Sequence, residues 1–267
     1  MNEPDVLPIE IMINGTKRST RNSKGLPIAL EIKSIENFWN WFGDSTAVDD
    51  AGRPLVVFHS STFGDISEFD PNVGVYGKAG YGFYFSNEEG ANLFADYGDK
   101  FCASISAQGE IKKVNITPVY LKINSPLSLP HVDNLNSYLD TNQSFGVSKK
   151  YQKTPPVTAA PWIRQGYDGI VTSETTAKKV HKTQGLKILS QTDPKALRFP
   201  VYVVQDPCAI KSAIGNSGGF DPESKDICDR HLLTYMKSNQ LVDNIIKEAA
   251  ETNYRKDRSN QLGLTVM

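Results

Sequence analysis

Four short apolar runs constrain the fold of this chain more than any other feature. They read VVFHS, GFYFS, YDGIVT and PVYVVQD, they are rich in β-branched and aromatic residues, and turn-forming or polar residues surround them. The first is a short buried strand that we expect to end at His59. Apolar residues at helical spacing occur mainly toward the two ends of the chain. The pattern predicts an α+β domain, with a β-sheet core and flanking helices.

Three helices are predicted from apolar spacing. The first precedes the strands, with Ser34 as N-cap, Gly43 as stop and one apolar face made of Ile35, Phe38, Trp39 and Phe42. The second follows GFYFS, where Ser86 and Glu89 have the spacing of a capping box and Gly98 closes the helix. The third covers about residues 229–252. We therefore expect one helix near each end of the chain and a short helix between two of the strands.

The rest of the chain sets the domain organisation. Two further strands are expected at FCASIS and ITPVYLKINSPL. Residues 1–33 carry little periodicity and a basic patch, which predicts a loosely packed arm. We place one domain at residues 34–222, with a polar insertion at about 128–165 and a helical extension at 223–267.

Composition excludes several classes of protein. The 267 residues carry a net charge of −1, so no global positive field draws the chain onto nucleic acid. No apolar run reaches the ~18 residues of a membrane span, and no targeting segment is recognised at the N-terminus. Three cysteines without a CxxC pair argue against a disulfide framework. We expect a cytoplasmic protein that makes no membrane contact.

The common signatures of metal and nucleotide-binding sites are absent from the sequence. His59, His131, His181 and His231 are widely spread without ligand spacing, so no metal site is predicted. The stretch GVYGKAGYGFYF fits neither dinucleotide nor phosphate-loop motifs. What remains is His59 on one strand, Tyr84 on a strand after a glycine-rich loop, and VYVVQD followed by PCAIKSAIGNSGGFDP.

In the order and spacing of these pieces, the sequence resembles the ADP-ribosyltransferase fold. Within it, the chain is similar to the branch found in polyvalent proteins of phages and mobile elements, over about residues 38 to 222. The segment GFYFSNEEGANLFADYG also resembles catalytic domains of the poly(ADP-ribose)-polymerase type. The resemblance implies a split, mixed and antiparallel β-sheet core with flanking helices, and NAD as co-substrate.

The resemblance also implies roles for individual residues. His59 would hydrogen-bond the ribose of NAD, Tyr84 would stack on the nicotinamide ring, and Phe94 or Tyr97 would close the other side. The remaining cofactor contacts implied are Ser60, Ser61, Gly80, Gly82 and the position of Val201. Each has a structural alternative, because a histidine at a strand end and aromatics in a strand are also ordinary packing residues.

At Val201 the sequence departs from the family pattern. Related sequences tend to have an acid directly before the Y-[IV]-V stretch, and here that residue is valine. An aliphatic residue there implies transfer of a single ADP-ribose or loss of activity. Glu174, expected in the loop after DGIVTSE, and Asp206 are candidate replacement acids. A surface carboxylate is more often simply solvated.

A basic connection between the last two strands indicates where an acceptor would bind. It contains Lys178, Lys179, Lys182 and Lys187, which suit an acidic protein or nucleic acid, although a charge run is usually a solvated face. The leading hypothesis is a mono-ADP-ribosyltransferase toxin or host-modifying factor acting in the host cytosol. The alternatives are a pseudoenzyme of the same fold, an NAD glycohydrolase and a purely structural or partner-binding domain.

Overall fold

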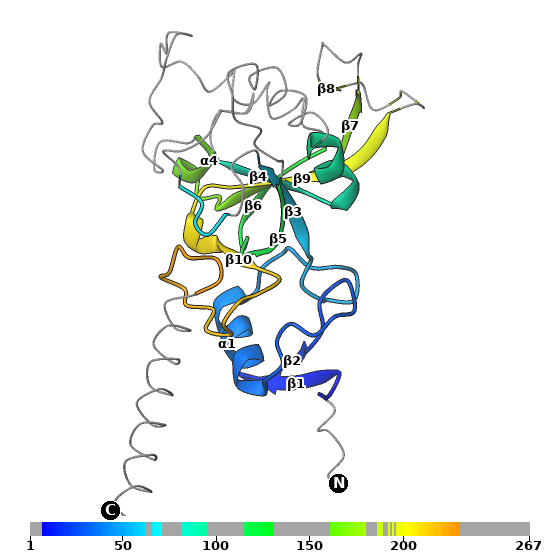
Figure 1. Cartoon of the computed structure of the whole chain (residues 1–267). Coiled ribbons are helices and arrows are strands. Elements are labelled where there is room, and N and C mark those ends of the chain that lie inside the picture. Colours follow the sequence, from blue (N-terminus) through cyan, green and yellow to red (C-terminus); the bar gives the residue numbers. More distant parts are fainter. Residues whose placement is uncertain are drawn as a thin grey trace, which may run out of the picture.

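A computed structural model describes residues 7–61, 66–70, 82–95, 115–130, 161–179, 186–188, 192, 194 and 196–229. Its centre is an eight-stranded sheet (Figure 1). The strands are β3 (Val57–Ser61), β4 (Phe83–Ser86), β5 (Asn115–Leu121), β6 (Pro126–Leu129), β7 (Gly169–Lys179), β8 (Leu186–Ile188), β9 (Leu197–Val204) and β10 (Ile210–Ser212). In these residues, no helix has the length and apolar character needed to cross a membrane.

The sheet is mixed and split, as the resemblance to ADP-ribosyltransferases implies. Its order is β10-β5-β3-β4-β9-β7-β6, with β8 paired to β7. All neighbours are antiparallel except β6 and β7. The described parts of β3 and β4 share one register pair, Phe58 with Ser86, whereas β3 and β5 share five. The sheet thus has two halves, which meet between β3 and β4, and the predicted α+β class is confirmed.

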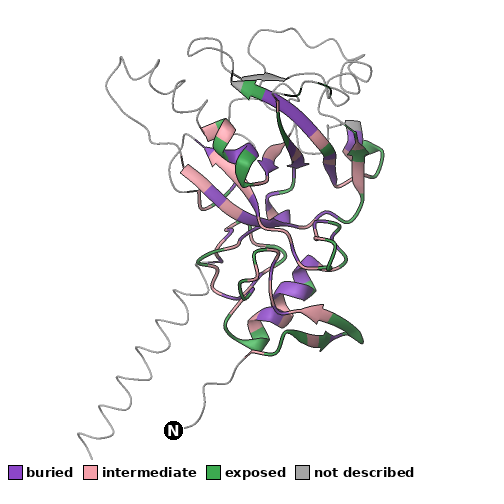
Figure 2. Cartoon of the chain, turned by 90° about the vertical axis from the view of Figure 1, so that its right-hand side faces the viewer, coloured by how far each residue is buried: buried purple, intermediate pink, exposed green. Residues whose placement is uncertain are grey.

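One face of the sheet is covered by α1 (Ile32–Phe42). Its Phe38 ring lies 4.9 Å from the ring of Tyr120 and 5.1 Å from that of Phe220. The two indoles of the helix bury their N–H groups by donating to backbone carbonyls, Trp39 to Ser19 and Trp41 to Cys208. Figure 2 shows α1 largely buried. This aromatic core is where the hydrophobic effect acts most strongly.

The other face carries a second, smaller core. It contains Trp162 of α4 (Pro161–Arg164), Ile170 of β7, and Phe199, Val201 and Val203 of β9. Tyr202 and Val204, which alternate with these β9 residues, belong to the first core. Alternate residues of a strand point to opposite faces, so β9 supplies side chains to both cores. This explains why PVYVV is continuously apolar.

The N-terminal segment is not the loosely packed arm predicted from its composition. Strands β1 (Glu10–Ile13) and β2 (Thr16–Ser19) form an antiparallel hairpin. Ile13 and Ile28 are buried in the first core, and Asn22 donates a hydrogen bond of 2.9 Å to the Tyr120 hydroxyl. The prediction of a loose arm is therefore wrong for residues 7–33. The boundary at residue 33 itself stays a prediction.

Two predicted helix starts are shifted. The first helix begins at Ile32 after Glu31, and Ser34 lies within its first turn against Gly218 instead of capping it. Gly43, with φ of 60°, ends the helix as predicted. In the second helix, over residues 88–95, Asn87 accepts the Gly90 N–H at 2.9 Å. The side chain of Ser86 instead donates to the Pro200 carbonyl. The capping-box prediction is therefore wrong.

Strand lengths also differ from expectation. Strand β3 runs two residues past His59 to Ser61, and ITPVYLKINSPL divides into β5 and β6. Strand β7 is long enough to include Glu174 and two of the lysines assigned to a loop. The predicted strand FCASIS, most of the polar insertion, and the C-terminal helix lie outside the described residues.

The segment after β9 contacts both α1 and the sheet. It includes η3 (Pro207–Ala209) and β10, and it continues to Asp229. Lys211 and Asp229, both 0% exposed, form an ion pair of 2.8 Å. The Lys211 ammonium also donates to the carbonyls of Ser224 and Asp226. We call this ion pair and its partners the Lys211–Asp229 clamp. Because a buried charge requires several partners, the clamp fixes residues 213–229 in place.

Candidate active site

His59 lies in the middle of β3, beside the split between the two halves of the sheet. Its Nδ1 is 2.7 Å from the backbone carbonyl oxygen of Tyr84. A carbonyl can only accept, so Nδ1 carries the hydrogen. Burial lowers the pKa of His59, and the bond to Tyr84 opposes this in part. The imidazole is therefore neutral near pH 7, and its Nε2 is a hydrogen-bond acceptor.

The ring of His59 packs among aromatic side chains. Its centroid is 5.1 Å from that of Phe69 and 5.4 Å from that of Phe85. Phe85 belongs to the first core, so His59 points to the face of the sheet that α1 covers farther along. These contacts hold the imidazole in one orientation while leaving Nε2 without a partner among the described residues. The histidine predicted from the sequence is thus positioned as a hydrogen-bond acceptor.

Tyr84 packs against the opposite face of the sheet. Its ring contacts the second core, which contains Val201 and Val203. Ser60, on the same face, donates its hydroxyl hydrogen to the Ala91 carbonyl and so ties β3 to the helix over 88–95. The structure therefore joins His59 and Tyr84 through a backbone hydrogen bond and places their rings on different faces. It does not show them as two walls of one pocket.

Phe94 and Val201 lie on the same face as Tyr84. The Phe94 ring is 36% exposed and meets the ring of Phe199 edge to face, 5.8 Å away. Val201 is 2% exposed, and its backbone N–H donates to Thr172 Oγ1 at 3.0 Å. The position where related sequences tend to have an acid is therefore filled by a buried apolar side chain.

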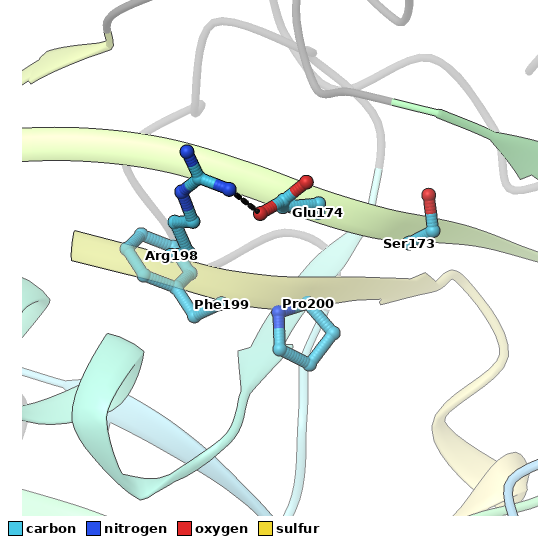
Figure 3. Close-up of a pocket in the computed structure, with 5 residues that line it drawn as sticks. All are labelled: Ser173, Glu174, Arg198, Phe199 and Pro200. Carbon is cyan, nitrogen blue, oxygen red and sulfur yellow. Dashed lines mark hydrogen bonds and ion pairs between the residues drawn. The ribbon is translucent and has the colours of Figure 1, made fainter. Parts of the chain in front are cut away.

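Glu174 lies within β7 at an irregularity in its pairing with β9, so its predicted place in a loop is wrong. Its Oε1 forms an ion pair of 3.0 Å with Arg198, and both side chains are partly exposed. The two residues line a pocket of about 370 Å³ together with Ser173, Phe199 and Pro200 (Figure 3). Arg198 alternates with Phe199 and Val201 along β9, so this ion pair lies on the other face from the Val201 side chain.

The second candidate acid has a structural role. Asp206 precedes η3, and its Oδ1 accepts the backbone N–H of Cys208 at 2.9 Å. This is the geometry of a helix cap, which satisfies an N–H group that the helix leaves without a partner. Asp206 thus stabilises the turn into β10.

The glycine before β4 has a packing reason rather than a visible ligand-binding one. Gly82 has φ of 132°, and a Cβ atom there would lie 2.7 Å from Val203 Cγ1. Only glycine lets the chain pass β9 so closely with this backbone conformation. Gly80 and Tyr97, the other predicted contacts in this region, lie outside the described residues. Ser61 is buried at the end of β3.

The basic connection begins inside the sheet. Lys178 and Lys179 end β7, Lys187 is in β8, and Lys178 is opposite Lys187 in the antiparallel register. Lys182 lies outside the described residues. In the described ranges no three His, Cys, Asp or Glu side chains gather as metal ligands.

Sequence reasoning did not identify Thr117. This residue of β5 pairs with His59 in the antiparallel register, and its side chain is 9% exposed. Its Oγ1 is buried and has no hydrogen-bond partner among the described residues. The sequence does contain a signal for it. Thr117 is a polar residue in the alternating series that continues with Val119 and Leu121, whose side chains are expected to be buried.

Comparison with known families decides the class of protein. The family described as ADP-ribosyltransferase in polyvalent proteins matches residues 49–220. The chain belongs to this family. Searches of curated proteins and of solved structures found no match. The match covers His59, Tyr84, Val201 and the strands that carry them, and it supports ADP-ribosyl transfer with NAD as substrate.

The described residues fit NAD in one respect that can be checked. NAD carries ribose hydroxyl groups that both donate and accept hydrogen bonds. The acceptor Nε2 of His59 on β3 and the Thr117 hydroxyl on the neighbouring β5, which has no partner among the described residues, belong to opposed residues of the sheet. Such a pair is suited to a hydroxyl group of a substrate.

Proposed function

We propose that the chain is a mono-ADP-ribosyltransferase that cleaves NAD between nicotinamide and ribose. It transfers ADP-ribose to a macromolecular acceptor, a protein or a nucleic acid. The observation that carries this proposal is His59, a half-buried, neutral histidine oriented by the Tyr84 carbonyl within the stretch that matches the family. A neutral imidazole accepts a hydrogen bond from a ribose hydroxyl, which fixes the sugar without adding charge.

The residue types suit this chemistry. Departure of nicotinamide leaves positive charge on the ribose, comparable to that in glycoside hydrolysis. A protonated histidine beside this carbon would oppose that charge, whereas the neutral His59 does not. Tyr84 and Phe94 lie on the opposite face of the sheet from the His59 ring, so we assign the ribose contact to His59 and do not place these two aromatic rings against the nicotinamide.

The product is expected to be a single ADP-ribose unit. Adding a second ADP-ribose to the first requires a carboxylate side chain that activates a hydroxyl group of the first unit. Val201 is buried among apolar side chains, and both Glu174 and Asp206 are engaged in other contacts. The acceptor would therefore supply its own nucleophile, and it would lose a proton as the new bond to ribose forms.

We assign the acceptor to the end of β7. The lysines Lys178, Lys179, Lys182 and Lys187 of this stretch of sequence support the assignment, because clustered positive charge suits an anionic acceptor. A role as a toxin or host-modifying factor inside a host cell is part of this proposal, on the strength of the family alone.

The test is consumption of NAD by the full chain. Purified protein is incubated with labelled NAD and a cell lysate, and free nicotinamide and labelled macromolecules are measured. We expect both products, and we expect His59→Ala to reduce them at least tenfold while the protein remains folded. Release of nicotinamide without labelled macromolecules would identify an NAD glycohydrolase, with water as acceptor. A folded protein that consumes no NAD would refute the proposal that the chain is an enzyme.

One observation favours a second function, a pseudoenzyme that binds NAD without cleaving it. The buried Val201 leaves no carboxylate at the position used by related enzymes. Calorimetric titration with NAD separates the two proposals. Binding without nicotinamide release supports the pseudoenzyme, and binding with release supports the transferase.

A further inference from the structure

The strands β3 and β5 change from apolar to polar along one face. Their register pairs are Val57 with Val119, then His59 with Thr117, then Ser61 with Asn115. Opposed residues of an antiparallel pair point to the same face, about 5 Å apart at Cβ. The first pair is in the core. We call the other four residues the polar strip.

Within the polar strip, Thr117 is the residue whose buried hydroxyl group has no structural explanation. Buried side-chain oxygens that lack a partner are rare, because each costs about 1–3 kcal/mol of desolvation. In the described part of the chain, the Thr117 Oγ1 is such an oxygen. Thr117 is also the register partner of His59. A hydroxyl kept in this state beside a candidate catalytic histidine indicates a group that receives its partner from a ligand.

The two atoms have complementary roles. Nε2 of His59 can only accept a hydrogen bond, since Nδ1 holds the ring hydrogen. The Thr117 hydroxyl can donate. A substrate hydroxyl can therefore donate to Nε2 and accept from Thr117 at the same time. Two such bonds fix both the position and the rotation of the hydroxyl, whereas His59 alone would leave the rotation free.

We propose that Thr117 is a positioning residue that binds the same ribose hydroxyl as His59. The inference rests on the proposed reaction with NAD and adds a residue to it. It also makes a statement about stability. Replacing a buried hydroxyl that has no partner among the described residues with a methyl group removes a desolvation cost, so Thr117→Val is expected to keep or raise the melting temperature.

The experiment compares three variants for folding, NAD binding and nicotinamide release. Thr117→Val removes the hydroxyl and keeps the shape, Thr117→Ser keeps the hydroxyl, and Thr176→Val removes a buried hydroxyl elsewhere in the sheet. We expect Thr117→Val to lower kcat/KM for NAD about tenfold, the usual size of one hydrogen bond. We expect Thr117→Ser to retain most of the activity, and Thr176→Val to retain it wherever it folds.

Substrate analogues identify the group that Thr117 contacts. NAD lacking the 2′-hydroxyl or the 3′-hydroxyl of the nicotinamide ribose is used in the same assay. For the analogue without the contacted hydroxyl, wild type and Thr117→Val should have equal kcat/KM. A loss of melting temperature in Thr117→Val together with equal losses for NAD and both analogues would assign Thr117 a structural role and overturn the inference.

The outcomes for Thr117 and for the proposed function remain distinguishable. If wild type releases nicotinamide and Thr117→Val does so at the same rate, the inference fails and the transferase stands. If wild type only binds NAD, the dissociation constant decides, and an unchanged value in Thr117→Val overturns the inference. If wild type neither binds nor cleaves NAD, both fail.

Discussion

The Lys211–Asp229 clamp, which is fully buried, and the polar strip, which is only partly buried, are two polar regions of the same sheet with opposite character. In the clamp, the ammonium has three acceptors, and both oxygens of Asp229 are used, the second by Asn216 and the Asp221 N–H. In the polar strip, His59 Nε2 and Thr117 Oγ1 have no partner among the described residues. The comparison separates polar groups that hold the fold together from polar groups available to a substrate.

The largest effect is expected from breaking the clamp on one side. Lys211→Met leaves the Asp229 carboxylate buried without its counter-charge, which typically costs about 3–5 kcal/mol. Urea unfolding followed by tryptophan fluorescence measures this loss. The double variant Lys211→Met with Asp229→Leu should recover most of the stability, because apolar pairs replace buried ion pairs well. A single variant within 1 kcal/mol of wild type would show that the clamp is not a buried ion pair in solution.

A carboxyl group placed at position 201, now Val201, tests whether this position lies in the packed core or faces the substrate. Val201→Glu inserts a polar group into the second core, and we expect a loss of about 2–4 kcal/mol and no gain in nicotinamide release. Val201→Gln is the uncharged control of similar size. Increased nicotinamide release or longer ADP-ribose products from Val201→Glu would show that the side chain reaches the substrate after all.

The pH dependence of stability reports on His59. Its pKa is lowered in the folded protein, so the unfolded chain binds a proton first as the pH falls. The stability linked to His59 is complete above its unfolded pKa of about 6.5 and is lost as the pH falls from there toward the folded pKa. Between pH 7.5 and 5.5, wild type should lose more stability than His59→Gln. Equal losses in urea unfolding would mean that the ring is not buried in its neutral form.

The smallest effect is expected at the Glu174–Arg198 pair. Both side chains are partly exposed, and such pairs contribute about 0–1 kcal/mol. Glu174→Gln should therefore change the free energy of unfolding by less than about 0.5 kcal/mol and nicotinamide release by less than twofold. Arg198→Gln breaks the same ion pair and serves as the control. A large loss of activity in Glu174→Gln alone would identify Glu174 as the replacement acid.

The sequence predicted the elements that depend on local spacing. The apolar positions of α1, its end at Gly43, and the strands carrying His59 and Tyr84 follow from periodicity and turn residues that lie within a few positions of each other. The resemblance to the family was confirmed by the match over residues 49–220. These features need no knowledge of distant contacts.

Features that depend on distant contacts were missed. In the sequence, Ser34 has the properties of an ordinary capping residue. Only the structure shows that it packs against Gly218. The N-terminal segment has little periodicity, yet Asn22 reaches Tyr120 and Ile13 enters the core. The role of Thr117 required the register of β3 and β5, and the opposed faces of His59 and Tyr84 required their neighbours. Register and burial between remote segments are what composition and spacing cannot supply.

The docking of α1 has a consequence for the order of events during synthesis. Phe38 of α1 packs on Phe220, and Asn37 donates to the Gly218 carbonyl, so the helix meets part of its site only after residue 220 has been made. At about 5–20 residues per second, that interval is on the order of ten to forty seconds. Throughout it, the aromatic face of the first helix is a candidate target for chaperones on the ribosome.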